Sequence, residues 1–410
     1  MLRSSSARRP NLLTGAGARA FWTLVGIRVA FWVGTALTLL WAPTQFTAPD
    51  RDLTQAPFLA YEARSDLLFN IFSLWDSGWF LNIAENGYRG EQSAAFFPLY
   101  PLLVHALAWV TRSALVAGVL ISLVSAGFAA VAVQRIAREL LSERAARDSV
   151  LLLALWPVAF VFTAVYSDGL FVALAAWSFW AGLQRRPVLA GVLGSLAVGT
   201  RLLGVALLPA LVVLLWPRER RLSRRAVRLA PLALLPIALA LYAWYLERRL
   251  GNWRAIYEAQ GAFWLRHRPT AGPLGGLWEA VSQGYHGVAE VILHLGRASH
   301  VSGADEIGTR NALHLALLLA MLWLTWVAWR RLGSAAAVYS LAYLAVVLSS
   351  TVPYFPLVSL PRFVLGDFPL FLALASVTER RPTLRQALLI GFAAVGGAAA
   401  IAFSRNLWVA

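Results

Sequence analysis

A short segment that is both acidic and aromatic, residues 74–88 (LWDSGWFLNIAENGY), stands out in a chain that is otherwise mostly apolar. It places one carboxylate, Asp76, between Trp75 and Trp79, and Glu91 follows soon after. Aromatic rings can stack on the apolar C–H face of a sugar while a carboxylate accepts hydrogen bonds from its hydroxyls. These residue types therefore favour a carbohydrate-binding site.

The same segment also has a purely structural explanation. An aspartate before a short apolar-periodic run that stops at Asn86 and Gly87 is typical of a helix with an N-cap and a glycine stop. Tryptophan is also an ordinary anchor at membrane interfaces. The sequence therefore predicts a short helix after Asp76, and it leaves open whether Asp76 binds substrate or caps that helix.

Composition identifies the elements that must position these residues. Of the 410 residues, 59% are hydrophobic and only 14% are charged, as expected for an all-α polytopic membrane protein. Several runs approach the roughly 20 apolar residues that cross a bilayer. The net charge of +16 comes from arginine without lysine, which we interpret as membrane topology and not as nucleic-acid binding. The absence of cysteine excludes disulfides and thiolate metal sites.

Charge bias orders the spans. The basic N-terminus is predicted to be cytoplasmic and followed by a first span, because residues 21–41 are too long for a signal peptide. Residues 43–113 then form a first outer loop, which holds an acid-rich stretch and a juxtamembrane helix at 98–110, and residues 247–310 form a second. In the second loop, apolar residues at helical spacing predict an interfacial helix over 277–295, with Trp278 on its apolar face.

This topology predicts a single domain, residues 1–410, with about eleven crossings. They are placed at about residues 21–41, 114–133, 149–165, 169–183, 188–200, 202–216, 229–246, 311–329, 335–352, 363–377 and 387–403.

The topology also brings scattered polar residues to the outer membrane boundary. They are Asp76, Glu91, Asp168, Arg201, Gln260, Arg266, Arg362 and Asp367. Charges at such a boundary are costly enough to indicate a functional site. The alternative is that each one ends a helix in the lipid headgroups.

The pattern W-D-S, I-A-x-x-G-Y, E, A-F-F-P-x-Y-P within residues 75–101 resembles the signature of the PIG-V-like mannosyltransferases, taken here as a bacterial member of that family. Weaker similarities occur in AVYSDGLF (164–171), GTRLLGVALL (199–208) and SLPRFVLGDFPLF (359–371). The resemblance implies a GT-C glycosyltransferase fold, with a catalytic aspartate at Asp76 in the first outer loop. It also implies a polyprenyl-phosphate sugar donor, typically a mannosyl one.

A lipid-phosphate donor explains why one carboxylate suffices, since phosphate leaves as a stable anion. We therefore expect an inverting displacement with Asp76 as general base, although Glu91 stays an alternative base. Arg201 and Arg362 are the expected phosphate ligands, because guanidinium groups match phosphate oxygens; snorkelling to headgroups is the alternative for each. The other expected substrate-binding residues are Trp75, Trp79, Glu91, Tyr166, Asp168, Gln260 and Arg266.

The expected acceptor is a glycolipid or cell-envelope glycan at the extracytoplasmic face of the bacterial inner membrane. No cofactor is expected, although Asp76 and Glu91 leave a divalent metal open. The rival hypothesis is a transporter or a flippase for lipid-linked sugars, because boundary charges and broken helices also build transporters. The sequence leaves protein partners unknown.

Overall fold

A computed structural model describes residues 15–41, 71, 73–216, 222–294, 303–405, 407 and 409. Secondary structure in these ranges is helical apart from one isolated antiparallel bridge between His267 and Thr351. The predicted all-α polytopic fold class is confirmed. Most of the acid-rich stretch of the first outer loop, residues 43–70, lies outside the described residues.

Five helices in the described ranges are long and apolar enough to cross a membrane, and a bent pair adds a sixth. The long helices are α1 (Gly15–Trp41), α5 (Ala114–Leu140), α11 (Leu234–Leu250, extended by residues before it), α14 (Gly303–Leu332) and α18 (Pro382–Ser404). Shorter apolar helices are α4 (Leu99–Thr111), α7 (Asp168–Leu183), α8 (Pro187–Thr200), η4–α9 (Leu202–Ala206, Leu207–Leu215) and α15 (Ser334–Leu348). The predicted count of eleven crossings stays a prediction.

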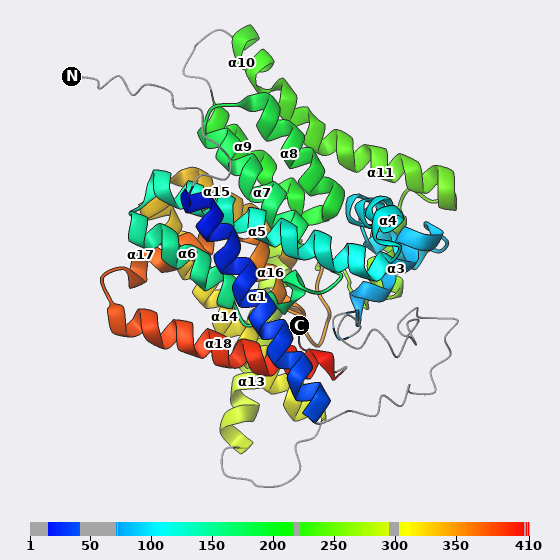
Figure 1. Cartoon of the computed structure of the whole chain (residues 1–410). Coiled ribbons are helices and arrows are strands. Elements are labelled where there is room, and N and C mark those ends of the chain that lie inside the picture. Colours follow the sequence, from blue (N-terminus) through cyan, green and yellow to red (C-terminus); the bar gives the residue numbers. More distant parts are fainter. Residues whose placement is uncertain are drawn as a thin grey trace, which may run out of the picture.

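Helix α1 packs on α5 and on α6 (Glu143–Leu155), and α18 lies beside α1 (Figure 1). The sequence fixes the starts of these helices. Ser113 and Ser142 are N-caps whose side chains accept from the backbone N–H groups of Val116 and Ala145. Proline stands in the first turn of α18, where a missing N–H costs nothing.

Several helices stop or bend where polar residues must be placed. Helix α6 ends at Leu155 because Pro157 follows, so the predicted span at 149–165 was wrong; its second half is a turn and the short helix η3 (Ala159–Phe162). The backbone is extended at Arg201, between α8 and η4. Helices α16 (Leu360–Gly366) and α17 (Pro369–Thr378) meet at 88°.

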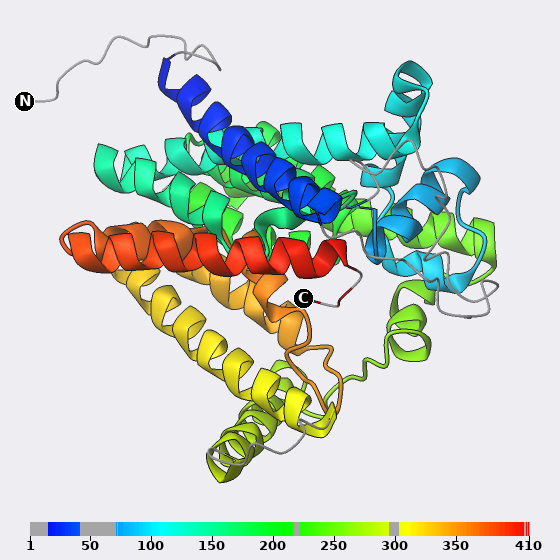
Figure 2. The same ribbon diagram turned by 60° about the horizontal axis from the view of Figure 1, so that its bottom comes forward.

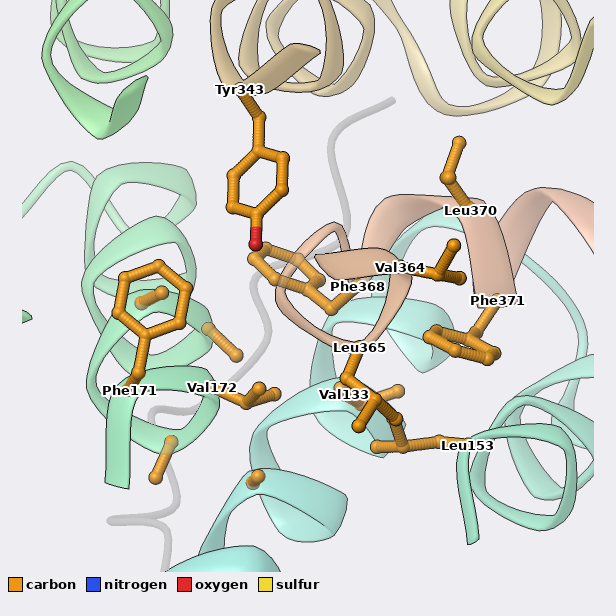
Figure 3. Packing of buried hydrophobic residues seen from close by; sticks show 14 of the residues in the cluster. Val133, Leu153, Phe171, Val172, Tyr343, Val364, Leu365, Phe368, Leu370 and Phe371 are labelled. Carbon is orange, nitrogen blue, oxygen red and sulfur yellow. The ribbon is translucent and has the colours of Figure 1, made fainter. Parts of the chain in front are cut away.

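The core around α16 fixes this bend. Leu365 points toward Val133 of α5 and Leu153 of α6, and Val364 lies beside Leu370 of α17 (Figure 3). Phe368 packs against Tyr339 of α15, with ring centroids 5.3 Å apart. Phe171 and Tyr343 face each other from α7 and α15, with ring centroids 6.3 Å apart. Close packing of large rings restricts movement, so α16 has one well-defined position.

The outer elements gather at one end of the bundle. Helix α3 (Asp76–Asn86), η2 (Glu91–Ala95) and α4 lie together beside the end of α11 in Figure 1, and α12 (Ala255–Ala262) packs on η2. Helix α13 (Pro273–His294) forms a hairpin with α14 and is the yellow-green helix at the bottom of Figure 2.

Helix α13 matches the predicted interfacial helix. Its inner face consists of small residues, with Gly284 and Gly287 in close contact with α14. Its predicted apolar face, including Trp278 and Ile292, is exposed. An exposed apolar face beside a tightly packed small-residue face suits a helix lying at a lipid surface.

Candidate active site

A cavity of about 890 Å³ opens between the outer elements and the bundle. Its wall takes residues from α3, the turn before α7, the α8–η4 break, the segment after α12, and α16. The charged residues on this wall are Asp76, Arg201, Arg266, Arg268 and Arg362. Four guanidinium groups against one carboxylate make the cavity electropositive, which favours an anionic ligand.

Asp76 reaches this cavity from the first turn of α3. The helix begins at Asp76 itself and ends at Asn86, and Gly87 follows with φ 71°, a conformation that favours glycine, as the predicted glycine stop requires. The N-cap position belongs to Trp75, and Oδ2 of Asp76 accepts a hydrogen bond from Nη1 of Arg362. The N-cap interpretation of Asp76 was therefore wrong. About 24% of the Asp76 side chain remains exposed.

Arg362 is shared between two carboxylates. Besides Asp76, it binds Asp168, whose Oδ2 accepts from Nη2 at 2.8 Å and from Nε at 3.1 Å. Asp168 also binds a second arginine, because its Oδ1 lies 2.5 Å from Nη1 of Arg201. The side chains of Arg362 and Asp168 are only 9% and 6% exposed. Charged groups buried to this degree must be paired, so the four residues form one network.

Neighbouring elements hold the two arginines in place. Arg201 sits at the α8–η4 break, where Gly204 allows the chain to turn back closely: a Cβ there would lie 2.5 Å from the backbone nitrogen of Val198. Arg362 follows Pro361, whose carbonyl accepts from the indole N–H of Trp156 at 2.7 Å. The guanidinium of Arg362 also lies 4.4 Å from the ring centroid of Tyr166.

Arg266 contributes a cation that is bonded to backbone carbonyls. Its Nη1 donates to the carbonyl of Ser350 at 2.8 Å, and its Nη2 lies 3.5 Å from that of Val358. Both Arg266 and Arg201 lie within 6 Å of the Phe363 ring, at 5.9 and 5.8 Å. Burial lowers the pKa of Arg266 to about 10, and nearby Asp76 opposes this shift, so Arg266 stays charged at neutral pH.

Backbone strain is concentrated at this cavity. Five non-glycine residues in the described ranges have positive φ, and three of them are at the site. Trp75 (φ 59°) precedes Asp76, Leu265 (φ 55°) precedes Arg266, and Ser359 (φ 65°) opens the turn that carries Arg362. Such conformations cost about 1–3 kcal/mol each and are typical of functional sites.

The tryptophans occupy different layers. Trp75 lines the cavity, whereas Trp79 stacks on Phe96 at 5.6 Å and lies behind the cavity wall. Trp264, which the sequence analysis missed, lines the cavity and contacts both of these rings. Trp79 therefore packs against Phe96 and Trp264 and does not line the cavity, where it was expected to stack on a sugar. The sequence WLRHRP, residues 264–269, combines an aromatic residue with basic ones, and this pattern could have identified Trp264 as a site residue.

Of the remaining predicted residues, two line the cavity and two do not. Tyr166 and Gln260 line the cavity, and the Gln260 carbonyl accepts from the backbone N–H of Arg266 at 3.0 Å. Glu91 is exposed outside it and accepts from Nδ2 of Asn252 at 2.8 Å. Asp168 lies behind the wall, bonded to arginines.

Asp367 is also not part of the cavity wall, since it is fully buried between α16 and α17, and its Oδ1 accepts from Ser340. In the part of the chain that the structure covers, no three His, Asp or Glu side chains gather as they do around a metal ion. The two possible metal ligands, Asp76 and Glu91, are not brought together, because Asp76 lines the cavity and Glu91 is bonded to Asn252 outside it.

Comparison with known proteins adds the family. No curated protein matches the chain at a significant level. Among solved structures, the chain is similar to an archaeal oligosaccharyltransferase, AglB from Archaeoglobus fulgidus, in complex with an inhibitory peptide and a dolichol-phosphate. The identity is 14% and the TM-score 0.40; the match covers 94% of this chain and 55%, about half, of that one. This likeness is too low to support an argument.

The family model for Mannosyltransferase (PIG-V) matches residues 28–215. The match includes Asp76, Asp168 and Arg201, three of the four members of the buried charge network. Residues 28–215 of the chain therefore match the mannosyltransferase (PIG-V) family.

Proposed function

We propose that this protein transfers mannose from a polyprenyl-phosphate donor to a hydroxyl of a glycolipid or cell-envelope glycan. The family makes it a glycosyltransferase, and its apolar helices make it a multi-pass membrane protein. One observation carries the finer proposal: a carboxylate, Asp76, and several arginines share the wall of a large cavity whose other residues are mostly apolar or aromatic.

The cavity suits a lipid with a phosphate headgroup. Leu202, Leu203, Val205, Val346 and Val347 provide an apolar wall for an isoprenoid chain. The adjacent arginines suit the phosphate, because guanidinium groups donate paired hydrogen bonds to its oxygens.

The three arginines differ in how their charge is balanced. Arg201 and Arg362 are ion-paired with Asp168, whereas Arg266 is held by the carbonyls of Ser350 and Val358. Carbonyl groups carry no net charge, so we assign Arg266 as the principal phosphate ligand, with Arg201 and Arg362 in support.

The chemical step is a single displacement at the anomeric carbon. The acceptor oxygen forms a bond to that carbon, and its proton passes to the carboxylate of Asp76. The bond between the anomeric carbon and the phosphate oxygen breaks, and its electron pair stays on polyprenyl phosphate. The arginines stabilise the charge that builds up on this leaving group, so no general acid is required. One displacement inverts the anomeric configuration.

Arg362 links donor binding to this step. In the structure its Nη1 contacts Asp76, and its Nη2 and Nε contact Asp168. A donor phosphate beside Asp76 competes for Nη1 and leaves the Asp168 contacts intact. Donor binding thereby frees the Asp76 carboxylate for the acceptor proton, which makes premature deprotonation of water less favourable.

We place the reaction at the extracytoplasmic face of the bacterial inner membrane, with the N-terminus in the cytoplasm. Support comes from the arginine-rich sequences of α10 (Leu222–Leu229), which precedes α11, and of the end of α14, which charge bias assigns to one side, and from the outer elements on the other.

The aromatic part of the wall, with Trp264, Phe96 and Tyr257, suits the sugar of the acceptor.

A transfer assay tests this function. Purified protein in nanodiscs receives polyprenyl-phosphate mannose labelled in the sugar, together with an envelope glycolipid extract. The expected result is labelled glycolipid and free polyprenyl phosphate, with GDP-mannose inactive as the control donor. If the donor is instead moved across proteoliposomes with its sugar bond intact, the protein is a flippase and the proposal fails.

A further inference from the structure

The segment after α12 lines the cavity and is hydrogen-bonded to the turn between α15 and α16. We call residues 264–269 the strap. Its His267 forms an antiparallel bridge with Thr351: the His267 N–H donates to the Thr351 carbonyl at 2.8 Å, and the Thr351 N–H donates back at 3.1 Å. Two backbone hydrogen bonds therefore hold the strap to the turn between α15 and α16. The same turn supplies the Ser350 carbonyl that accepts from Arg266.

Glu279 of α13 secures both partners of this bridge. Its Oε1 lies 2.9 Å from Nε2 of His267, and its Oε2 accepts from the hydroxyl of Thr351 at 2.6 Å. Helix α13 itself packs closely on the end of α15, because Gly276 leaves no room for a side chain against the Leu348 carbonyl. The carboxylate thus joins three elements at one point.

Arg266, His267 and Arg268 all line the cavity. Nε2 of His267 is bonded to Glu279, and the guanidinium of the adjacent Arg266 lies on the cavity wall between the carbonyls of Ser350 and Val358. Leu265, directly before Arg266, is held at φ 55°, a strained conformation that persists only when surrounding contacts enforce it. The bridge and the Glu279 contacts supply that enforcement.

We propose that Glu279 and Thr351, acting through His267, are positioning residues that hold Arg266 ready for the donor phosphate and so set the affinity for polyprenyl phosphate. Neither Glu279 nor Thr351 lines the cavity, so they act through the strap. The inference rests on the proposed function, because it assigns Arg266 to the phosphate of a lipid donor.

Equilibrium binding of polyprenyl phosphate to the protein in nanodiscs tests the inference. Losing a hydrogen bond that positions a charged ligand group weakens binding about tenfold, and we expect this for Glu279→Ala and Thr351→Val. Thr351→Ser keeps the hydroxyl and should bind as wild type does. Glu290→Ala, on the same helix but away from the strap, is the matched control. The corresponding alcohol, polyprenol, should not distinguish these variants.

A double-mutant comparison identifies the route of the effect. If Glu279 acts through Arg266, Glu279→Ala causes no further loss of affinity in an Arg266→Ala background. Equal losses in both backgrounds, or no loss from Glu279→Ala while Arg266→Ala weakens binding, would overturn the positioning role and leave the proposed function standing. Failure of the wild-type protein to bind polyprenyl phosphate would overturn both.

Discussion

At the scale of single residues, the site is a network of ion pairs in which each buried charge contacts two partners. Asp168 holds Arg201 and Arg362, and Arg362 in turn contacts Asp76. Asp76, Arg201 and Arg362 were singled out from the sequence because each is a charge at a membrane boundary. Their pairing was not predictable, since it depends on side chains brought together from positions up to 286 residues apart. Asp168, which was expected to bind substrate, instead binds two arginines.

The Asp168 network predicts a specific defect. Asp168→Asn removes the negative charge between two buried arginines, and breaking a buried ion pair costs about 3–5 kcal/mol. We expect a lower melting temperature in detergent and a large loss of transfer activity. Asp148→Asn is the control, because Asp148 is equally buried but binds Arg385, at 2.7 Å through both oxygens, and is not part of the cavity wall.

In protein that remains folded, Asp148→Asn should retain its turnover while Asp168→Asn does not. Equal activity per folded molecule in the two variants would show that Asp168 has only a structural role.

At the scale of elements, local sequence predicted some boundaries and missed others. The end of α3 followed from Gly87, whereas its start lies one residue before the one that an N-cap at Asp76 would give. The break at Arg201 followed from a charge between two apolar runs. The helix expected through residue 165 ends at Leu155, because Pro157 disfavours helical backbone at the residue before it, and the prediction followed the apolar run instead of this proline. The strap was missed because a single bridge leaves no periodic pattern.

The tight return at the α8–η4 break gives a prediction at this scale. Gly204→Ala places a methyl group against the backbone of Val198, with a closest approach of 2.5 Å, so the break must open and move Arg201. Overpacking of this kind costs about 1–3 kcal/mol. We expect reduced thermal stability together with weaker binding of polyprenyl phosphate.

Gly199→Ala, five residues earlier along the chain, is the matched control, since its added methyl would meet Leu99 at an ordinary 3.5 Å. A Gly204→Ala protein that binds polyprenyl phosphate as well as Gly199→Ala does would contradict the role given to this turn.

At the scale of the whole molecule, composition and charge bias were sufficient to predict an all-helical membrane protein with its polar residues collected at one end. They did not predict which aromatic rings face the cavity. Trp79 and Trp264 contact each other, but only Trp264 lines the cavity, while Trp79 lies behind it. That distinction arises from tertiary packing, which a single sequence does not encode in any local pattern.

The orientation of the molecule can be measured directly because the chain contains no cysteine. Arg89→Cys places a single exposed thiol beside η2, and Arg381→Cys places one at the start of α18. In intact spheroplasts, a membrane-impermeant maleimide should label the first variant and should label the second only after lysis. The reverse pattern would put the cavity in the cytoplasm and would contradict the proposed side of the reaction.

The most direct test of the central claim separates binding from chemistry at Asp76. For Asp76→Asn in nanodiscs, we predict that the dissociation constant for polyprenyl-phosphate mannose stays within a few-fold of wild type while kcat for transfer falls by a factor of roughly 10²–10⁴, the usual contribution of a general base. Glu91→Gln, which alters the exposed acid outside the cavity, should leave both quantities near wild type. Transfer by Asp76→Asn at the wild-type rate, or its loss in Glu91→Gln alone, would contradict the assignment of Asp76 as the base.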